Sequence, residues 1–308
     1  MNRFINLIIL TFIFIVSIKF LLPDPKTNKE QLDSFWSNKT HASNSFDILA
    51  CGDSRIYRGV SSDVINPNRK NLAFLNLGYS SAGLSDDYLK FVLSKFKPRS
   101  KNKILIVGIT PHSLTFEAFK NEGLKSQEKI NYFNKFKFKY FSFLLKYVVP
   151  FKFSEILKFK KLNYVQRYES DGWVASTKIE QDSTFALNSY KKTFNKYGVH
   201  HKEMVSFLES INRIANSGIH VIAFRPPSTL QMEILEDSIS GFDENFIKEN
   251  LDSSVIWMDF NNADFISYDG SHLTEKSAVK FSKMIMQEIE SIYKKSAILD
   301  QHPNSSSQ

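Results

Sequence analysis

Five apolar runs of strand length alternate with stretches of helical periodicity, and this alternation most constrains the fold. The runs are near-continuous in apolar residues, as expected of parallel strands that helices cover on both faces. They are residues 46–52, 73–78, 103–110, 219–226 and 255–260. Between and after them, residues 83–96, 202–218 and 274–295 space their apolar residues as helices do, with Gly218 and Thr274 as expected caps. The pattern predicts a doubly wound α/β domain with a five-stranded parallel sheet.

The net charge of the chain indicates the kind of molecule or surface that it could bind. The 308-residue chain has a formal net charge of +8, which favours an anionic partner such as a nucleic acid or an anionic membrane surface. Its one cysteine, Cys51, excludes an intrachain disulfide and disfavours a zinc site built on cysteines. We expect no metal and no organic cofactor.

The amino-terminal segment 5–22 is apolar except for Lys19. A cleaved signal peptide and a buried core helix are the alternatives to a membrane span. No small-residue cleavage pattern follows, and a core helix seldom has apolar residues around its whole circumference. We therefore predict a transmembrane signal anchor over residues 1–22. Positive charges on its two sides nearly balance, so charge does not decide the orientation.

The rest of the chain divides by composition. Residues 23–44 are polar with two prolines and predict a linker, and residues 297–308 predict a disordered tail. The α/β domain is expected over 45–296. It is interrupted at about 111–218, a gap too long for one crossover, so we predict a helical insertion there.

Within that insertion, residues 131–161 combine many aromatic residues with eight lysines and a single acid, Glu155. Three interpretations fit. The segment could be an ordinary helical subdomain, an interfacial helix on an anionic leaflet, or a binder of single-stranded nucleic acid. A membrane-tethered chain favours membrane contact over nucleic acid, and we predict that the segment packs beside the carboxyl edge of the sheet.

Ser54 lies in "CGDSRIYRG", just after the first apolar run. A serine at such a junction commonly caps the following helix. It is a nucleophile only if a base takes its proton and a third group orients that base. His272 and Asp269, in "SYDGSHLTEKSAVKF", follow the fifth run, so the expected sheet brings all three residues to one edge. We expect Ser54 Oγ about 3 Å from His272 Nε2, and Asp269 on Nδ1.

At these motifs the chain resembles the SGNH (GDSL-type) hydrolases. "GDSR" and "DGSH" resemble the first and last blocks of that family, over roughly residues 46–290 outside the insertion. The resemblance implies a flavodoxin-like sheet and a serine esterase mechanism through an acyl-enzyme on Ser54. The second block maps to "NLGYSSAG", so Gly78 or Ser81 would join the Ser54 N–H as donors to the oxyanion.

The third block departs from the family pattern G-x-N-D. Here the stretch is "GITPHS", with Thr110 in place of the asparagine that serves as the third oxyanion donor. Either Thr110 or His112 substitutes for it, or the protein is a slow or specialised member. The departure favours the membrane-anchored, envelope-modifying relatives, which the chain also resembles.

Two arginines complete the expected site. Arg55 and Arg225 fall at the same edge, either as structural ion pairs or as a clamp for an anionic or sugar-linked substrate. We predict a single-pass membrane protein with its α/β domain outside the cytoplasm. It would be an esterase or O-acyltransferase acting on an O-acyl group of an envelope glycan or lipid. The alternative is a catalytically inactive scaffold of the same fold that binds an envelope polymer or a partner enzyme.

Overall fold

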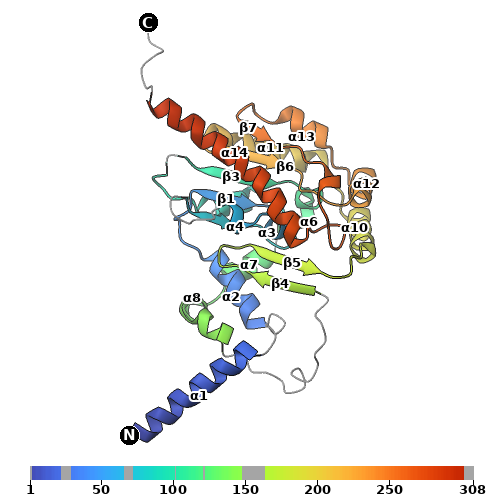
Figure 1. Ribbon diagram of the computed structural model, residues 1–308. Helices are drawn as coiled ribbons and strands as arrows, with labels where there is room; N and C mark the ends of the chain where they lie inside the picture. The colour runs from blue at the N-terminus through green and yellow to red at the C-terminus, as the bar shows by residue number, and fades with distance from the viewer. Residues whose placement is uncertain are drawn as a thin grey trace.

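The computed structural model describes residues 2–21, 29–65, 72–100, 102–120, 122–147 and 164–301. It contains one five-stranded sheet, one two-stranded sheet and helices around them (Figure 1). In chain order the elements are α1 (Asn2–Leu21), α2 (Lys29–Thr40), β1 (Ile48–Cys51), α3 (Ser54–Gly59), α4 (Ser62–Ile65), β2 (Phe74–Asn76), α5 (Asp86–Leu93), β3 (Ile104–Gly108), η1 (His112–Leu114), α6 (Phe116–Lys120), α7 (Glu122–Glu128), α8 (Tyr132–Tyr147), β4 (Tyr164–Tyr168), β5 (Val174–Lys178), α10 (Thr184–Lys196), α11 (His201–Asn216), β6 (His220–Phe224), α12 (Leu230–Ile239), α13 (Glu244–Asn250), β7 (Val255–Trp257), η2 (Asn262–Asp264) and α14 (Glu275–Gln301).

All strands of the larger sheet run parallel, in the order β2-β1-β3-β6-β7. Counted along the chain, this is the 2-1-3-4-5 order of flavodoxin-like sheets. Each of the five strands lies within one of the five predicted apolar runs, which confirms the α/β class and the parallel five-stranded sheet. The three central strands β1, β3 and β6 are buried almost throughout, because helices cover both faces.

The two faces of the sheet have separate apolar layers. On one face α5 and α11 pack on side chains such as Leu49 and Val107. On the other face lie α3 and the long helix α14 (Figure 1). They pack on Ile48 and Ile106, and Phe281 of α14 is fully buried. Alternate residues of one strand therefore serve opposite layers, as the two-residue period of a strand requires.

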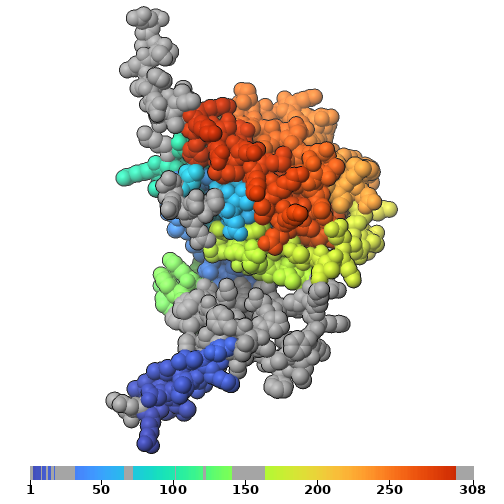
Figure 2. Space-filling model, in the orientation of Figure 1, coloured from blue at the N-terminus to red at the C-terminus, as the bar shows by residue number. Residues whose placement is uncertain are grey.

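The predicted helical insertion is only partly helical. It contains η1, α6, α7, α8, α10 and α11, but also the antiparallel hairpin β4–β5, which we had not predicted. The hairpin contacts α3 and α14 (Figure 2), and its Trp173 is buried in the same layer as α14. A tight turn at Gly172 (φ +92°) allows the hairpin to approach β2, because a Cβ there would lie 2.0 Å from the Asn76 carbonyl oxygen.

The prediction of a linker over residues 23–44 is wrong for residues 29–40, which form α2. Its Lys39 is fully buried, and Nζ donates to the Gly172 carbonyl at 3.1 Å. Burial lowers the Lys39 pKa well below its ordinary value, against an opposing effect of Asp171. Four ring centres lie 5.3 to 5.7 Å from Nζ, those of Phe35, Trp36, Tyr57 and Tyr79. Tyr57 and Tyr79 belong to the α/β body, so this aromatic cage packs α2 against it.

The ends of the chain also differ from expectation. Helix α14 continues to Gln301, so residues 297–301 of the predicted disordered tail are helical, and 302–308 lie outside the described residues. The predicted anchor coincides with α1, on which Phe4, Leu7 and Phe14 are exposed. Within the described part of the chain, no helix meets the length and apolarity needed to span a bilayer. Membrane attachment through residues 1–22 stays a prediction.

We expect two amino-terminal truncations to differ in stability. Removing residues 1–22 leaves the melting temperature unchanged, because the exposed side chains of α1 bury little surface. Removing residues 1–44 also deletes α2 and its buried Phe35 and Lys39, and lowers the melting temperature by on the order of 10 °C. Differential scanning calorimetry of both chains measures this. Equal melting temperatures would mean that α2 adds nothing, and loss of folding in the shorter truncation would place α1 in the core.

Candidate active site

The turn from β1 into α3 determines what the Ser54 hydroxyl does. Gly52 has φ +143°, and a Cβ there would lie 2.7 Å from the Gly108 carbonyl oxygen, so the sharp turn requires glycine. Asp53, not Ser54, is the N-cap of α3, because its Oδ1 accepts from the Arg55 N–H at 2.9 Å. The capping alternative for Ser54 is therefore wrong, and its hydroxyl is free to face another partner.

That partner is His272. Ser54 Oγ lies 2.8 Å from His272 Nε2, and His272 Nδ1 lies 2.8 Å from Asp269 Oδ2. The distance between Ser54 and His272 agrees with the expected 3 Å, although 218 residues separate them along the chain. The three side chains form one continuous chain of hydrogen bonds at the carboxyl edge of the sheet, beyond β1 and β7.

The loop between β7 and α14 holds the imidazole in place. Asp269 Oδ1 accepts from the backbone N–H groups of Ser271 and His272, at 3.0 and 2.8 Å. Its other oxygen is left for the His272 ring. Gly270 (φ +90°) completes the turn, and the Thr229 N–H donates to its carbonyl oxygen at 3.0 Å. The "DGSH" spacing thus makes one carboxylate both shape the loop and orient the histidine.

The electrostatics suit a neutral histidine beside an ionised aspartate. Burial raises the pKa of Asp269, but hydrogen bonds from His272 and Ser271 outweigh burial and lower that pKa to about 2. Burial lowers the pKa of His272 below its ordinary value of 6.5, and the positive charge of Arg58 lowers it further, against the Asp269 hydrogen bond. At neutral pH, His272 is therefore uncharged and able to accept a proton.

The expected oxyanion donors are engaged elsewhere. The Gly78 N–H donates to Asn76 Oδ1 at 2.9 Å. The Thr110 hydroxyl is fully buried and donates to Asp53 Oδ2 at 2.6 Å. Ser81 is exposed with φ +52°, and among the described residues we find no hydrogen bond joining it to the triad. The Ser54 N–H remains, because N–H groups in the first turn of a helix have no intrahelical acceptor.

Arg55 forms a structural ion pair, the first of the two roles expected for it. Its guanidinium is buried and forms an ion pair with the buried carboxylate of Glu236, while Nε donates to Ser271 Oγ at 3.0 Å. Ser271 belongs to the loop that holds Asp269 and His272, so this ion pair connects α3, α12 and that loop. Arg55 therefore links buried parts of the site, and its guanidinium is not exposed to solvent.

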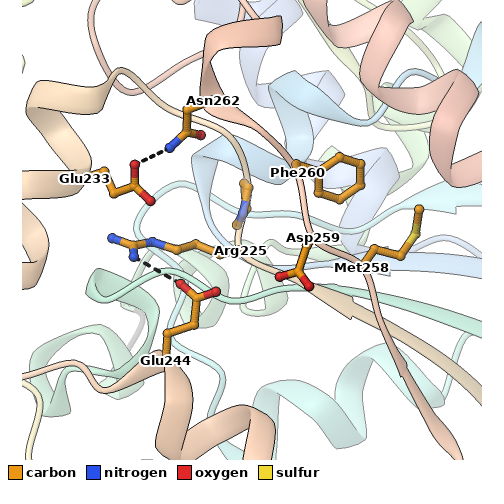
Figure 3. Close-up of a pocket in the computed structure, with 8 residues that line it drawn as sticks. Arg225, Glu233, Glu244, Met258, Asp259, Phe260 and Asn262 are labelled. Atoms are coloured by element: carbon orange, nitrogen blue, oxygen red, sulfur yellow. Dashed lines mark hydrogen bonds and ion pairs between the residues drawn. The ribbon is translucent and has the colours of Figure 1, made fainter.

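Arg225 is likewise bound by carboxylates. It contacts Glu236 at 3.0 Å, Asp237 at 2.8 Å and Glu244 at 3.1 Å. It lines a cavity of about 40 Å³ together with Glu233 (Figure 3). Such a cavity holds a few water molecules, and neither Ser54 nor His272 lines it.

Sequence reasoning missed several neighbours of the triad. Tyr268 stacks on His272, with ring centres 5.8 Å apart and planes 18° apart. Tyr190 of the insertion accepts from Ser271 Oγ at 3.1 Å, and His112 lies edge-on to its ring. No local motif marks the two tyrosines, whereas His112 lies in the "GITPHS" stretch and was named there with Thr110 as a substitute oxyanion donor. Arg58 is an exception, because its position four residues after Ser54 places both on one face of α3.

Comparisons with protein-family models, curated proteins and solved structures found no match. The site is therefore interpreted from its own geometry. Among the residues that the structure describes, no group of three His, Cys, Asp or Glu side chains is arranged to hold a metal ion. The arrangement is that of an activated serine hydroxyl.

The structural role of Arg55 leads to a stability prediction. Arg55→Met leaves the Glu236 carboxylate buried with one arginine fewer, and we expect it to lower the free energy of unfolding by about 3–5 kcal/mol. The double variant Arg55→Met, Glu236→Leu removes both buried charges and should recover part of that loss. Urea unfolding measures both. A stable single variant would mean that the Arg55–Glu236 pair is not structural.

Proposed function

We propose that the protein is a serine acyl-esterase or O-acyltransferase that works through an acyl-enzyme on Ser54. The observation that carries the proposal is the hydrogen-bonded series Ser54–His272–Asp269, with both heavy-atom distances at 2.8 Å. A serine hydroxyl, a neutral imidazole and an ionised carboxylate in this order are the parts of a nucleophilic triad.

The geometry suggests the following reaction. Ser54 Oγ attacks the carbonyl carbon of an ester while its proton passes to His272 Nε2, and Asp269 stabilises the resulting imidazolium. The Ser54 N–H donates to the developing oxyanion. His272 then gives its proton to the leaving alkoxide as the C–O bond breaks. Water or an acceptor hydroxyl attacks the acyl-enzyme by the reverse sequence, so hydrolysis and transfer differ only in the attacking group.

The substrate class follows from the resemblance to SGNH hydrolases at "GDSR" and "DGSH". Membrane-anchored relatives of this kind modify envelope polymers, and the proposed substrate is an O-acyl group of an envelope glycan or lipid outside the cytoplasm. The flavodoxin-like strand order and the position of Ser54 after β1 are consistent with this assignment.

A catalytically inactive scaffold is the second candidate. One observation favours it: the Gly78 N–H and the Thr110 hydroxyl are both engaged within the protein. Loss of one oxyanion donor costs on the order of 10²–10³ in rate. An active enzyme would therefore be slow on simple esters, and a scaffold would show no serine-dependent turnover at all.

Esterase activity and its pH dependence separate the two candidates. We expect 4-nitrophenyl acetate hydrolysis to rise with pH as His272 loses its proton. Because the pKa of His272 is lowered from 6.5, the rate reaches its plateau at a lower pH than it would with a histidine of ordinary pKa. Asp269→Asn should reduce kcat by about 10³–10⁴ through loss of the correct tautomer, and shift the acidic limb to lower pH, since Asp269 raises the pKa of His272.

Ser54→Ala is the control for this measurement. Its rate should fall at least as far as that of Asp269→Asn, because the nucleophile itself is removed, while its unfolding transition stays that of the wild type. A folded wild-type protein with the same rate as Ser54→Ala at every pH would contradict the enzyme and support the scaffold.

Membrane contact through the insertion remains part of the proposal, but it is now assigned to the exposed part of α8. Helix α8 packs on α2, with Phe138 buried and its carbonyl accepting from Asn38, and not beside the catalytic edge as predicted. Residues 148–161 lie outside the described residues. The exposed part of α8 carries aromatic residues beside lysines, and it lies on the same side of the molecule as α1 (Figure 1).

We expect the body lacking residues 1–22 to co-sediment with anionic liposomes. Reversing three lysines of α8 to glutamate (Lys135, Lys137 and Lys139) should weaken binding at least tenfold, because each lysine near an anionic surface contributes about 1 kcal/mol. The matched control reverses Lys191, Lys192 and Lys196 of α10. Equal binding to neutral vesicles, or equal effects of the two reversals, would contradict this contact.

A further inference from the structure

Helix α3 presents two residues toward the outside of the protein. Arg55, Ile56, Tyr57 and Gly59 are buried, whereas Ser54 and Arg58 are partly exposed. Residues four apart lie on the same helix face, about 6 Å apart along the axis. The guanidinium of Arg58 therefore belongs to the same open face as the candidate nucleophile.

Arg58 is surrounded by neutral donors and acceptors. Its Nε donates to Tyr57 OH at 3.2 Å, and its Nη1 donates to Tyr164 OH at 2.8 Å and to Tyr268 OH. Burial raises the pKa of Tyr268 far above neutrality, so that hydroxyl carries no charge. Among the described residues, no carboxylate lies within ion-pair distance of Arg58, and no acceptor is found for its Nη2.

The two other arginines near the site differ from Arg58. Glu236 neutralises Arg55, and Arg225 contacts three carboxylates. A partly buried cation normally has an anionic partner, because leaving water is costly for a charge. Within the described part of the site, Arg58 is the arginine that has no carboxylate partner, so its charge is available to an anionic ligand.

Two elements hold Arg58 in this position. Trp173 of the hairpin donates from Nε1 to the Arg58 carbonyl oxygen at 3.1 Å, and Tyr164 of β4 contacts its guanidinium. Tyr268 connects the same guanidinium to the triad, because its ring stacks on His272. These contacts hold the Arg58 guanidinium against Tyr268, the residue whose ring stacks on His272.

We propose that Arg58 binds an anionic group, a carboxylate or a phosphate, that the ester substrate carries near its scissile ester bond. The inference rests on the proposed function and narrows it to esters that carry an anionic group. Arg58 is a specificity-determining residue, and its two Nη2 N–H groups are the donors directed at the anion.

Three aryl acetates that differ in one group test the proposal. They are 4-acetoxybenzoate with a carboxylate, 4-acetoxyphenyl phosphate with a phosphate, and 4-acetoxybenzamide as the neutral isostere of the first. The measurement is kcat/KM for each ester with the wild type, Arg58→Met, Arg58→Lys and Arg213→Met. Arg213 is the matched control, an exposed arginine of α11 that pairs with Asp86.

We expect the wild type to prefer at least one anionic ester to the amide. In Arg58→Met the ratio of anionic to neutral kcat/KM should fall by about 10- to 100-fold, the range for a lost charge-assisted hydrogen bond. Arg58→Lys should retain part of the preference and Arg213→Met all of it. The anionic ester whose kcat/KM relative to the amide falls more in Arg58→Met shows whether carboxylate or phosphate is the preferred group. An unchanged ratio in Arg58→Met, or an equal fall for all three esters, would overturn the inference.

Binding separates failure of this inference from failure of the proposed function. Ser54→Ala does not cleave the esters, so calorimetry gives their dissociation constants directly. If the wild type hydrolyses none of them, the proposed enzyme is wrong. In that case the anion site would still be supported if Ser54→Ala bound an anionic ester more tightly than the amide. The double variant Ser54→Ala, Arg58→Met should lose that difference. Equal binding of charged and neutral esters would overturn it.

Discussion

The parallel pairing of β1 with both β2 and β3 is the constraint on which the candidate active site depends. The chain leaves β1 over one face of the sheet and leaves β2 over the other. The connections therefore diverge beyond the carboxyl end of β1, where open α/β sheets bind their ligands. Ser54 is the second residue after the turn at Gly52, so the fold brings its hydroxyl to this point. The loop after β7 brings His272 and Asp269 from the far edge of the sheet.

Most of the buried charged groups near Ser54 are paired with other groups of the protein. Asp53 accepts from Thr110 and from the Arg55 N–H, and Glu236 accepts from Arg55 and Arg225. One of these contacts engages the Thr110 hydroxyl, which the family resemblance would assign to the oxyanion. The consequence is a set of buried ion pairs and hydrogen bonds beneath Ser54, while Ser54, His272 and Asp269 hydrogen-bond to one another. Only Arg58, among the described arginines of the site, remains without a carboxylate.

Local sequence patterns predicted the parts of the molecule that depend on neighbouring residues in the chain. Five apolar runs predicted five strands, and "GDS" and "DGSH" predicted which side chains meet at the sheet edge. The linker was predicted wrongly over residues 29–40, because polar composition does not reveal that Lys39 is enclosed by four aromatic rings from three segments. The hairpin β4–β5 and the contacts of Tyr190 and Tyr268 depend on pairings between distant residues. The engagement of Thr110 by Asp53 likewise follows from the approach of β3 to β1, which no single segment encodes.

Covalent labelling of the folded protein tests the central claim, that His272 and Asp269 activate Ser54 as a nucleophile. The protein is treated with a fluorophosphonate near neutral pH and digested, and the modified residue is located by mass spectrometry. The account predicts one modified serine, Ser54, in the native protein and none after unfolding in urea. No labelling of the native protein, or labelling of another serine with Ser54 unmodified, would contradict it.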